Sequence, residues 1–428
     1  MKVTGIIAEY NPFHKGHKYQ IDYCKKKLNS DYVIVAMSGD YVQRGTPALL
    51  PKHVRAEMAL RCGADLVLEM PVSVSTASAE AFAMGGVSML DGLHIVDSLC
   101  FGSEYGEVSA LMELAEILVE EPEEYRQLLK EFLNNGLSFP SARCQALTEY
   151  FKNPRNFTGD DFDGVLTPLL NQIVQILNSP NNILGIEYCK ALLRLKSSIK
   201  PVTLKRQGMG YHETLADTAT DNIPFASASA IRELLKAALT PETISRITAQ
   251  IPDEISSLLA SSLQRNEFLT EDVLDPLLSY CILKENASGL STYLDVSRDL
   301  AERIVNRSNE INGFLQAASL LKTKELTQTR IQRALLHIIL GIREVPATVP
   351  YARVLGFRKE SSALLKEIKD SSSIPLITKL ADADSLHSEA GRVLLSETTF
   401  ASNIYEKLLC QKSGRNFVHE YQKQIVIL

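Results

Sequence analysis

The sequence lacks the marks of several protein classes. Its seven cysteines are odd in number and form no CxxC pair, so their spacing indicates neither a zinc site nor a disulfide framework. The N-terminus has no long apolar stretch of the kind found in signal peptides and membrane helices. We therefore expect a cytoplasmic protein with reduced thiols and no membrane partner. The formal net charge of −6 gives no overall attraction to nucleic acid, so any RNA-binding surface must be local.

The pattern of the first part of the chain predicts an α/β fold. Short aliphatic runs alternate with segments of helical periodicity, which is typical of a doubly wound parallel sheet. In such a sheet, ligands bind beyond the carboxyl ends of the strands. The expected strands are 2–8, 32–37, 65–70, 95–101 and 199–205, and the expected helices include 16–28, 52–62 and 77–91.

The length of 428 residues is enough for roughly two or three domains. A hydrophobic content of 45% and a charged content of 22% are typical of a soluble globular protein. We predict an α/β domain over residues 1–240. Segments of period 3.6 predict a mostly helical second domain over residues 241–428. They are 243–262, 270–284, 293–305, 310–321 and 328–341, and apolar stretches near 373–379 and 423–428 predict a small additional sheet.

The motif His14-Lys15-Gly16-His17 directly follows the first expected strand and opens the first expected helix. Glycine lets the backbone approach a phosphate, and the start of a helix offers unpaired N–H groups. Two imidazoles can hydrogen-bond phosphoryl oxygens, so His14 and His17 are candidates for stabilising charge in a nucleotidyl transfer. The alternative is a polar loop with an ordinary helix cap.

A second motif, Ser227-Ala228-Ser229-Ala230-Ile231-Arg232, also precedes an expected helix. Two hydroxyls, the amides of a helix start and a guanidinium can converge there on a polyphosphate. Taken alone, it is an ordinary serine cap.

Together the two motifs resemble the HIGH-type nucleotidylyltransferase superfamily. The chain is most similar to the tRNA(Met) cytidine acetate ligase family, over residues 1 to about 240 and in weaker stretches to about 360. The runs that carry the resemblance are GIIAEYNPFHKGH, MSGDYVQRG, DLVLEMP, FGSEYG, SPNNILGIEY, YHE, SASAIR, LTQTRIQRALLH and PYARVLGFRKES. The last sixty or so residues carry no recognisable motif.

The resemblance implies a two-step reaction. Acetate attacks the α-phosphate of ATP to give acetyl-adenylate, and the wobble cytidine of elongator tRNA(Met) then takes the acetyl group to form N4-acetylcytidine. Mg²⁺ is expected to be coordinated by the ATP phosphates rather than by protein ligands. The resemblance leaves two alternatives open: a nucleotidylyltransferase for a small molecule, and a tRNA-binding protein without activity. It also leaves the oligomeric state and the choice of acetate over another small acid open.

The resemblance also implies an ATP site. The segment from Ile7 to Gln20 would wrap the nucleotide, and its members are Ile7, Ala8, Glu9, Tyr10, Asn11, Pro12, Phe13, His14, Lys15, Gly16, His17, Lys18, Tyr19 and Gln20. Gly102, Asn181 and Arg206 would complete the site together with Ser227, Ser229 and Arg232. Gly102 follows a strand, where a missing side chain leaves room for a base or ribose. Asn181 can equally be a helix-capping residue, and Arg206 a surface ion pair.

Further candidates lie in the loop after the second strand and on the helix that follows it. Arg44 and Arg55 are the candidates for holding the small carboxylate, with Lys52 adding positive charge. Glu69 and Glu104 are alternative polar contacts, although a solvated strand end explains them equally well.

A basic segment is the candidate RNA surface. Residues 321–380 contain eleven Lys or Arg and five acids, which gives about +6. Arg330 and Arg333 would lie one turn apart on a helix, and Tyr351 or Phe357 would offer a stacking surface. A solvated helical face is the alternative. The eleven are Lys322, Lys324, Arg330, Arg333, Arg343, Arg353, Arg358, Lys359, Lys366, Lys369 and Lys379.

Overall fold

The five predicted strands form one parallel sheet in the computed structural model, which describes residues 1–153, 173–206, 227–236, 240–386 and 388–428. The YHE run at 211–213 lies outside the described residues. The order across the sheet is β5-β2-β1-β6-β7. The bounds are β1 Val3–Ala8, β2 Tyr32–Ser38, β5 Leu66–Met70, β6 Ser98–Ser103 and β7 Lys200–Lys205.

The strand order reverses direction at β1, which has β2 on one side and β6 on the other. Such a switch point leaves a crevice beyond the carboxyl ends of the two central strands. The register brings these ends together, because Thr4 and Gly5 of β1 lie opposite Ser98 and Leu99 of β6. On the other side of β6, Gly102 lies opposite Leu204 of β7. The crevice is thus bounded by β1, β6 and β7.

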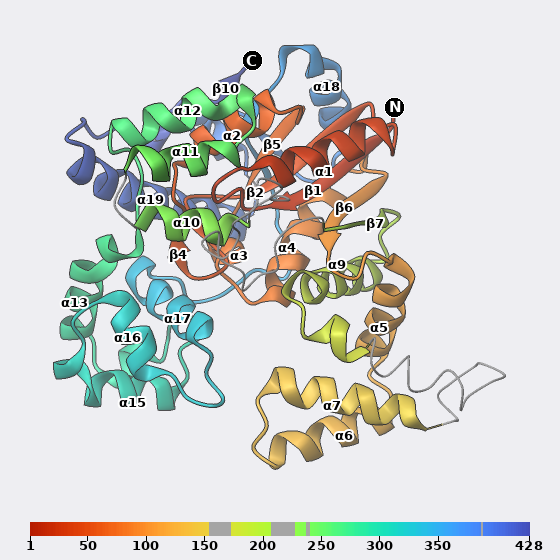
Figure 1. Cartoon of the computed structure of the whole chain (residues 1–428), viewed down its shortest axis with the longest axis vertical. Helices are drawn as coiled ribbons and strands as arrows, with labels where there is room; N and C mark the ends of the chain where they lie inside the picture. The colour runs from red at the N-terminus through yellow and green to blue at the C-terminus, as the bar shows by residue number, and fades with distance from the viewer. Residues whose placement is uncertain (154–172, 207–226, 237–239, 387) are drawn as a thin grey trace.

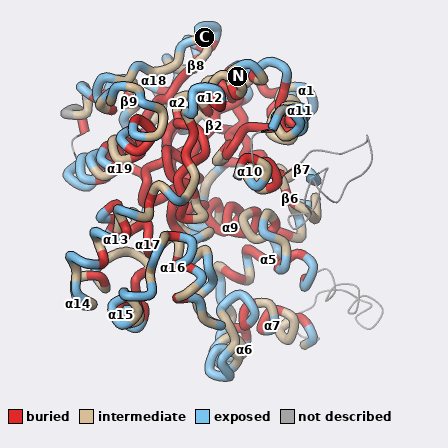
Figure 2. Tube along the Cα trace, turned by 60° about the vertical axis from the view of Figure 1, so that its left-hand side comes forward, coloured by how far each residue is buried: buried red, intermediate tan, exposed pale blue. Residues whose placement is uncertain are grey.

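Alternation along β1 directs side chains into two separate cores. Val3 and Ile7 face a core built with α4 and α9, whereas Ile6 faces a core built with α1 and α2. Figure 2 shows the buried residues concentrated in the sheet between these two layers. The helices of this part are α1 Lys15–Lys26, α2 Lys52–Arg61, α3 Val72–Ser75, α4 Ala79–Asp91, α5 Val108–Glu120, α6 Glu123–Asn134, α7 Phe139–Lys152 and α9 Pro180–Leu195.

The second half of the chain is mostly helical, as predicted, and Figure 1 shows α13, α15, α16 and α17 grouped below the sheet. The expected helix 243–262 is two helices, because Pro252 has no N–H to continue the first one. The bounds are α10 Ala228–Lys236, α11 Pro241–Ala249, α12 Asp253–Gln264, α13 Asp275–Lys284, α14 Ala287–Leu290, α15 Arg298–Asn306, α16 Phe314–Leu321, α17 Gln328–Leu340, α18 Ser362–Ser371 and α19 Glu389–Ser413.

The small additional sheet predicted for the second half does not form as a separate unit. β8 (Ala352–Phe357) pairs antiparallel with β5 of the main sheet, and β9 (Leu376–Ile377) and β10 (Val426–Ile427) pair with β8. β8 covers what would otherwise be an open strand edge. The sheet therefore contains strands from both predicted domains, and a boundary near residue 240 stays a prediction. Within the described residues, no helix has the length and apolar character needed to cross a membrane.

Buried charges join β5, β8 and the C-terminal segment. The Lys52 ammonium lies 2.6 Å from Glu69 and 2.7 Å from Glu420, and Arg353 lies 2.5 Å from Glu69 and 2.6 Å from Glu420. Each of these side chains is at most 6% exposed. Burial opposes ionisation of Glu420, but Lys52 and Arg353 outweigh it and hold the pKa of that carboxyl well below its usual range. Asp40 lies 3.6 Å from the Lys52 ammonium as well, so the two buried cations face three buried carboxylates.

We predict that Glu420→Gln lowers the free energy of unfolding by about 3 kcal/mol or more, because it removes the carboxylate charge shared by two buried cations and leaves Arg353 with Glu69 alone. Glu123→Gln is the matched control, since Glu123 pairs with Arg126 on the surface and is 68% exposed. It should have little effect. Urea unfolding of the two variants measures the difference. Equal stabilities would contradict a structural role for the network.

Candidate active site

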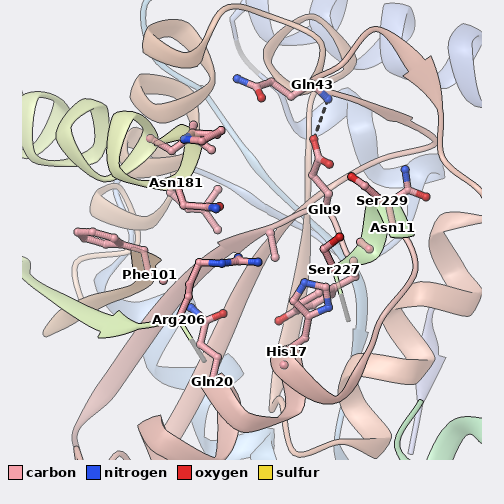
Figure 3. A pocket seen from close by; sticks show the side chains of 18 of the residues that line it. Glu9, Asn11, His17, Gln20, Gln43, Phe101, Asn181, Arg206, Ser227 and Ser229 are labelled. Carbon is pink, nitrogen blue, oxygen red and sulfur yellow. Dashed lines mark hydrogen bonds between the residues drawn. The ribbon is translucent and has the colours of Figure 1, made fainter. Parts of the chain in front are cut away.

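A cavity of about 460 Å³ lies at the switch point, at the carboxyl ends of β1, β6 and β7 (Figure 3). Most of the predicted ATP-site residues line it. They are Ile7, Ala8, Glu9, Tyr10, Asn11, His14, Gly16, His17, Tyr19, Gln20, Gly102, Asn181, Arg206, Ser227, Ser229 and Arg232, and Arg44 lines it too. The structure thus brings together residues that are more than 200 positions apart in the sequence.

The side chains of His14 and His17 cap the start of α1, because each accepts a hydrogen bond from a backbone N–H of the same turn. His14 Nδ1 accepts from the backbone N–H of Gly16 at 3.0 Å, and His17 Nδ1 accepts from the backbone N–H of His14 at 3.2 Å. The rings stack with their centroids 3.8 Å apart. This is a capping box in which imidazoles replace the usual serine and glutamate. The turn and the two rings are therefore held as one unit.

These hydrogen bonds define the chemistry of both rings. A neutral imidazole whose Nδ1 accepts a hydrogen bond carries its proton on Nε2. Burial, with Arg206 and Arg232 adding to it, lowers the pKa of His14 to about 3. Burial, then His14 and Arg206, lower the pKa of His17 well below its usual value. At neutral pH the pair consists of two uncharged Nε2–H donors, which suits hydrogen bonding to phosphoryl oxygens.

Two arginines bring positive charge to the cavity. Arg206 extends from the end of β7 across the cavity toward His17, as Figure 3 shows. Arg232 on α10 donates to the backbone oxygen of Asn11 at 2.6 Å and to the Ser229 hydroxyl at 3.1 Å. The Ser227 hydroxyl caps α10 by accepting from the Ala230 N–H at 3.2 Å. The second motif thus contributes a capped helix start and one guanidinium to the same space.

The side of the cavity near β6 is suited to a nucleoside. A Cβ on Gly102 would come no closer than 3.4 Å to Arg206, so the protein itself does not demand glycine, and the position opens to the cavity. Asn181 Nδ2 donates to Glu104 at 2.6 Å, and the backbone N–H of Asn182 donates to the same carboxylate at 3.0 Å. Glu104 therefore fixes the start of α9 at the wall of the cavity.

The opposite side is formed by the hairpin of β3 (Tyr41–Val42) and β4 (Thr46–Pro47). The Gln43 backbone N–H donates to the Glu9 carboxylate at 2.9 Å, drawn as a dashed line in Figure 3. Arg44 follows Gln43 and also lines the cavity. This side therefore combines a carboxylate and a guanidinium.

Arg55 is not among the residues that line the cavity, so the structure does not support the predicted contact with a carboxylate. It is fully buried, and its guanidinium donates to the backbone oxygens of Leu50 at 2.9 Å, Glu9 at 2.6 Å, Ser38 at 3.1 Å and also Gly39. These bonds use four of the five N–H donors of the guanidinium, and the side chain is fully buried away from the cavity. Arg55 instead fixes the loops after β1 and β2.

Other predicted residues are placed outside the cavity as well. Phe13 is buried in the core beside α1, and Lys18 pairs with Glu254 at 3.2 Å. The Lys15 backbone N–H donates to the Gln250 oxygen, and Pro12 follows a cis peptide bond. Lys52 and Glu69 belong to the buried network. Some side chains of the segment 7–20 therefore face the cavity, whereas the others support the turn.

Other residues that line the cavity were not among the predicted site residues. Five of them lie within three positions of a predicted site residue, so their strand or helix already indicated that they would be near the cavity. These are Phe101, Pro180, Ile183, Leu184 and Leu204. Thr329 comes from α17 in the second half and belongs to the run LTQTRIQRALLH, but no local pattern predicts that it lies at the cavity. Gln43, Tyr188 and Ala228 also line the cavity, and they lie in runs that carry the family resemblance. Ala79, Phe82 and Lys205 line it as well.

The basic segment does not form one continuous surface. Arg333 pairs with Asp295 at 3.0 Å, Arg353 is buried in the charge network, and Tyr351 is only 1% exposed. Phe357 packs against the sheet core. These residues therefore do not provide the predicted phosphate contacts and stacking surface. Arg330 is exposed on α17 and Lys324 just before it, whereas Lys369 is exposed on α18, which lies at the top of Figure 1, away from α17.

We predict that the rings of His14 and His17 remain neutral in the ligand-free protein from about pH 8 to pH 5, whereas an unperturbed histidine titrates near 6.5. Nitrogen-15 NMR of labelled histidines measures this, with the signals assigned through single substitutions and the urea-unfolded chain as reference. Because only the unfolded chain takes up protons there, the free energy of unfolding should fall as the pH drops below 6.5 toward 3. Protonation of either ring above pH 5 would contradict this electrostatic account.

Comparison with known proteins identifies the family. A family model described as HIGH Nucleotidyl Transferase matches residues 1–420. The tRNA(Met) cytidine acetate ligase of Acetivibrio thermocellus is 38% identical over 441 residues and covers 100% of both chains, and that of Clostridium tetani is 39% identical over 89% of this chain and 91% of its own. The crystal structure of Thermotoga maritima TmcAL bound with alpha-thio ATP is 29% identical, with a TM-score of 0.85 over 100% of both chains. The chain belongs to the HIGH nucleotidyl transferases and, within them, to the tRNA(Met) cytidine acetate ligase family.

Proposed function

We propose that this protein is an ATP-dependent ligase that activates acetate as acetyl-adenylate and transfers the acetyl group to N4 of the wobble cytidine of elongator tRNA(Met). The observation that carries the proposal is the switch-point cavity, in which two neutral Nε2–H donors meet Arg206 and Arg232. Family membership supplies the choice of reaction. The product is N4-acetylcytidine, and the by-products are AMP and pyrophosphate.

In the first step, an acetate oxygen attacks the α-phosphorus, and the bond to pyrophosphate breaks with its electron pair on the leaving group. Such a transfer needs alignment and charge stabilisation rather than a covalent enzyme intermediate. We assign His14 and His17 to the α- and β-phosphate oxygens as donors, and Arg206 and Arg232 to the polyphosphate charge. The adenosine lies against Gly102 and Asn181.

Arg44 is the residue proposed to hold the acetate carboxylate. It lines the side of the cavity away from Arg206, next to the Glu9–Gln43 hydrogen bond. Arg55 supports this side indirectly, because it fixes the backbone of Glu9 and of the loop that leads to the hairpin. Among the described residues, no group of three His, Cys, Asp or Glu side chains is placed to hold a metal ion. Mg²⁺ is therefore proposed to enter with the ATP phosphates.

The RNA is proposed to approach along α17. Thr329 on its first turn lines the cavity, and a Cβ on Gly45 of the hairpin would lie 2.4 Å from the Arg333 backbone nitrogen. The hairpin and α17 are thus in direct contact. The exposed Arg330 adjoins Thr329 on α17, and the exposed Lys324 precedes the helix. Cations there can bind backbone phosphates and hold the anticodon near the cavity.

The proposed function is tested by incubating the protein with ATP, Mg²⁺ and radiolabelled acetate, with and without unmodified elongator tRNA(Met). Label should enter the RNA as ATP is converted to AMP. AMP and pyrophosphate without labelled RNA would leave the adenylating step but exclude this acceptor. ATP that stays intact would favour a binding protein, and transfer of a nucleotidyl group to a small phosphorylated acceptor would favour the small-molecule enzyme.

We predict that His17→Ala lowers the rate of acetyl-adenylate formation by about a hundredfold or more, because it removes one preorganised donor. Acetate-dependent release of pyrophosphate measures this step. His94→Ala is the control, since His94 is exposed after α4 and should leave the rate unchanged. Thermal unfolding verifies that the cap removed with His17 has not unfolded the chain. An unchanged rate in His17→Ala would remove the ring from the proposed mechanism.

We predict that Lys324→Glu combined with Arg330→Glu weakens tRNA binding and flattens its salt dependence by about one unit of slope for each RNA phosphate that the variant no longer binds. Formation of acetyl-adenylate should not change. The control is Lys366→Glu combined with Lys369→Glu on α18, which makes the same charge change within the basic segment but far from α17. Equally weakened binding in both double variants would contradict an RNA path along α17.

A further inference from the structure

Glu9 is held in position more firmly than a typical side chain at a cavity wall. Its backbone oxygen accepts from Arg55 at 2.6 Å, and its Oε1 accepts from the Gln43 N–H at 2.9 Å. Tyr10, which follows it, has a left-handed backbone with φ of 49°, so the chain turns directly after Glu9. The carboxylate is therefore fixed on the cavity wall between β1 and the hairpin.

The charge of Glu9 is out of place in a site for a polyphosphate. It is the only carboxylate among the described residues that line the cavity, and it would repel the phosphates of ATP. Its Oε1 has the Gln43 partner, whereas no described residue donates a hydrogen bond to Oε2. One oxygen of a fixed carboxylate is thus available to a substrate.

Glu9 lies on the side of the cavity that the RNA is proposed to reach. Figure 3 shows its carboxylate pointing toward Gln43, away from Gln20 and Arg206. Arg44 adjoins Gln43 in the hairpin, and Thr329 of α17 lines the same cavity. A group on this side meets the nucleotide that enters after acetyl-adenylate has formed.

A carboxylate is the side chain that recognises the exocyclic amine of cytosine, because it accepts a hydrogen bond from N4–H. The amine attacks the acetyl carbon of the adenylate, the new C–N bond forms, and the bond from that carbon to the AMP oxygen breaks with its electron pair on AMP. The nitrogen must lose one proton in this step. Resting on the function proposed above, we infer that Glu9 is the catalytic base that positions N4 and accepts this proton through Oε2, before releasing it to solvent.

The test separates the two steps in Glu9→Gln, which keeps the shape and can still accept from Gln43. Hydroxylamine is the probe for the first step, because it is nucleophilic enough to take the acetyl group from acetyl-adenylate without a base. Because Glu9 lines the same cavity as the ATP-site residues, Glu9→Gln should lose part of its acetyl-hydroxamate formation from ATP and acetate, but much less than it loses of RNA acetylation. Its single-turnover acetylation of tRNA(Met) should be slower by about a hundredfold or more, which is the usual contribution of a general base.

Glu104→Gln is the contrasting variant, since Glu104 acts through Asn181 on the ATP side. It should raise the KM for ATP in both assays without a selective loss of RNA acetylation. The assignment is overturned if Glu9→Gln acetylates tRNA normally, and also if it loses hydroxamate formation in parallel, which would place Glu9 with ATP or its Mg²⁺. A wild-type protein that forms neither product contradicts the proposed function, and the role of Glu9 fails with it.

Discussion

The reciprocal hydrogen bonds of His14 and His17 determine what the cavity can do. Each Nδ1 accepts from a backbone N–H that the start of α1 would otherwise leave unpaired, so the same contacts begin the helix and fix the tautomer. Burial then keeps both rings neutral. Burying two neutral donors costs less free energy than burying two imidazolium ions. Their hydrogen bonds to phosphoryl oxygens still become stronger in a transition state in which those oxygens gain negative charge.

The second half of the chain completes the site from outside the nucleotide-binding fold. The buried charges of Lys52, Glu69, Arg353 and Glu420 join β8 and the C-terminal segment to the sheet. The hairpin that carries Gln43 and Arg44 packs directly on α17. One end of the cavity therefore belongs to the ATP-binding fold, and the other end lies at the contact with the helical half. This arrangement suits a reaction in which a small activated intermediate stays bound until a macromolecular acceptor binds.

Much of the fold could be predicted because its signals are local. The five parallel strands, and the motif placed after the first of them, follow from periodicity and turn residues within short windows. The pairing of β8 with β5 could not, because it depends on buried charges such as Arg353 and Glu69 that meet only after folding. Arg55 was predicted to bind a ligand because its partners are backbone oxygens from three segments, and these come together only in the folded chain. Thr329 reaches the cavity through tertiary packing alone.

The proposed reaction depends on the attack of acetate on the α-phosphorus of ATP in this cavity. It is tested most directly with acetate labelled with oxygen-18 in both carboxylate positions, in a complete reaction with tRNA(Met), followed by mass spectrometry of the AMP. Each AMP formed should carry one labelled oxygen, because the acetyl–oxygen bond breaks in the second step and leaves an acetate oxygen on the phosphorus. AMP without the label would show that acetate never joins the α-phosphorus, and the proposed first step would be wrong.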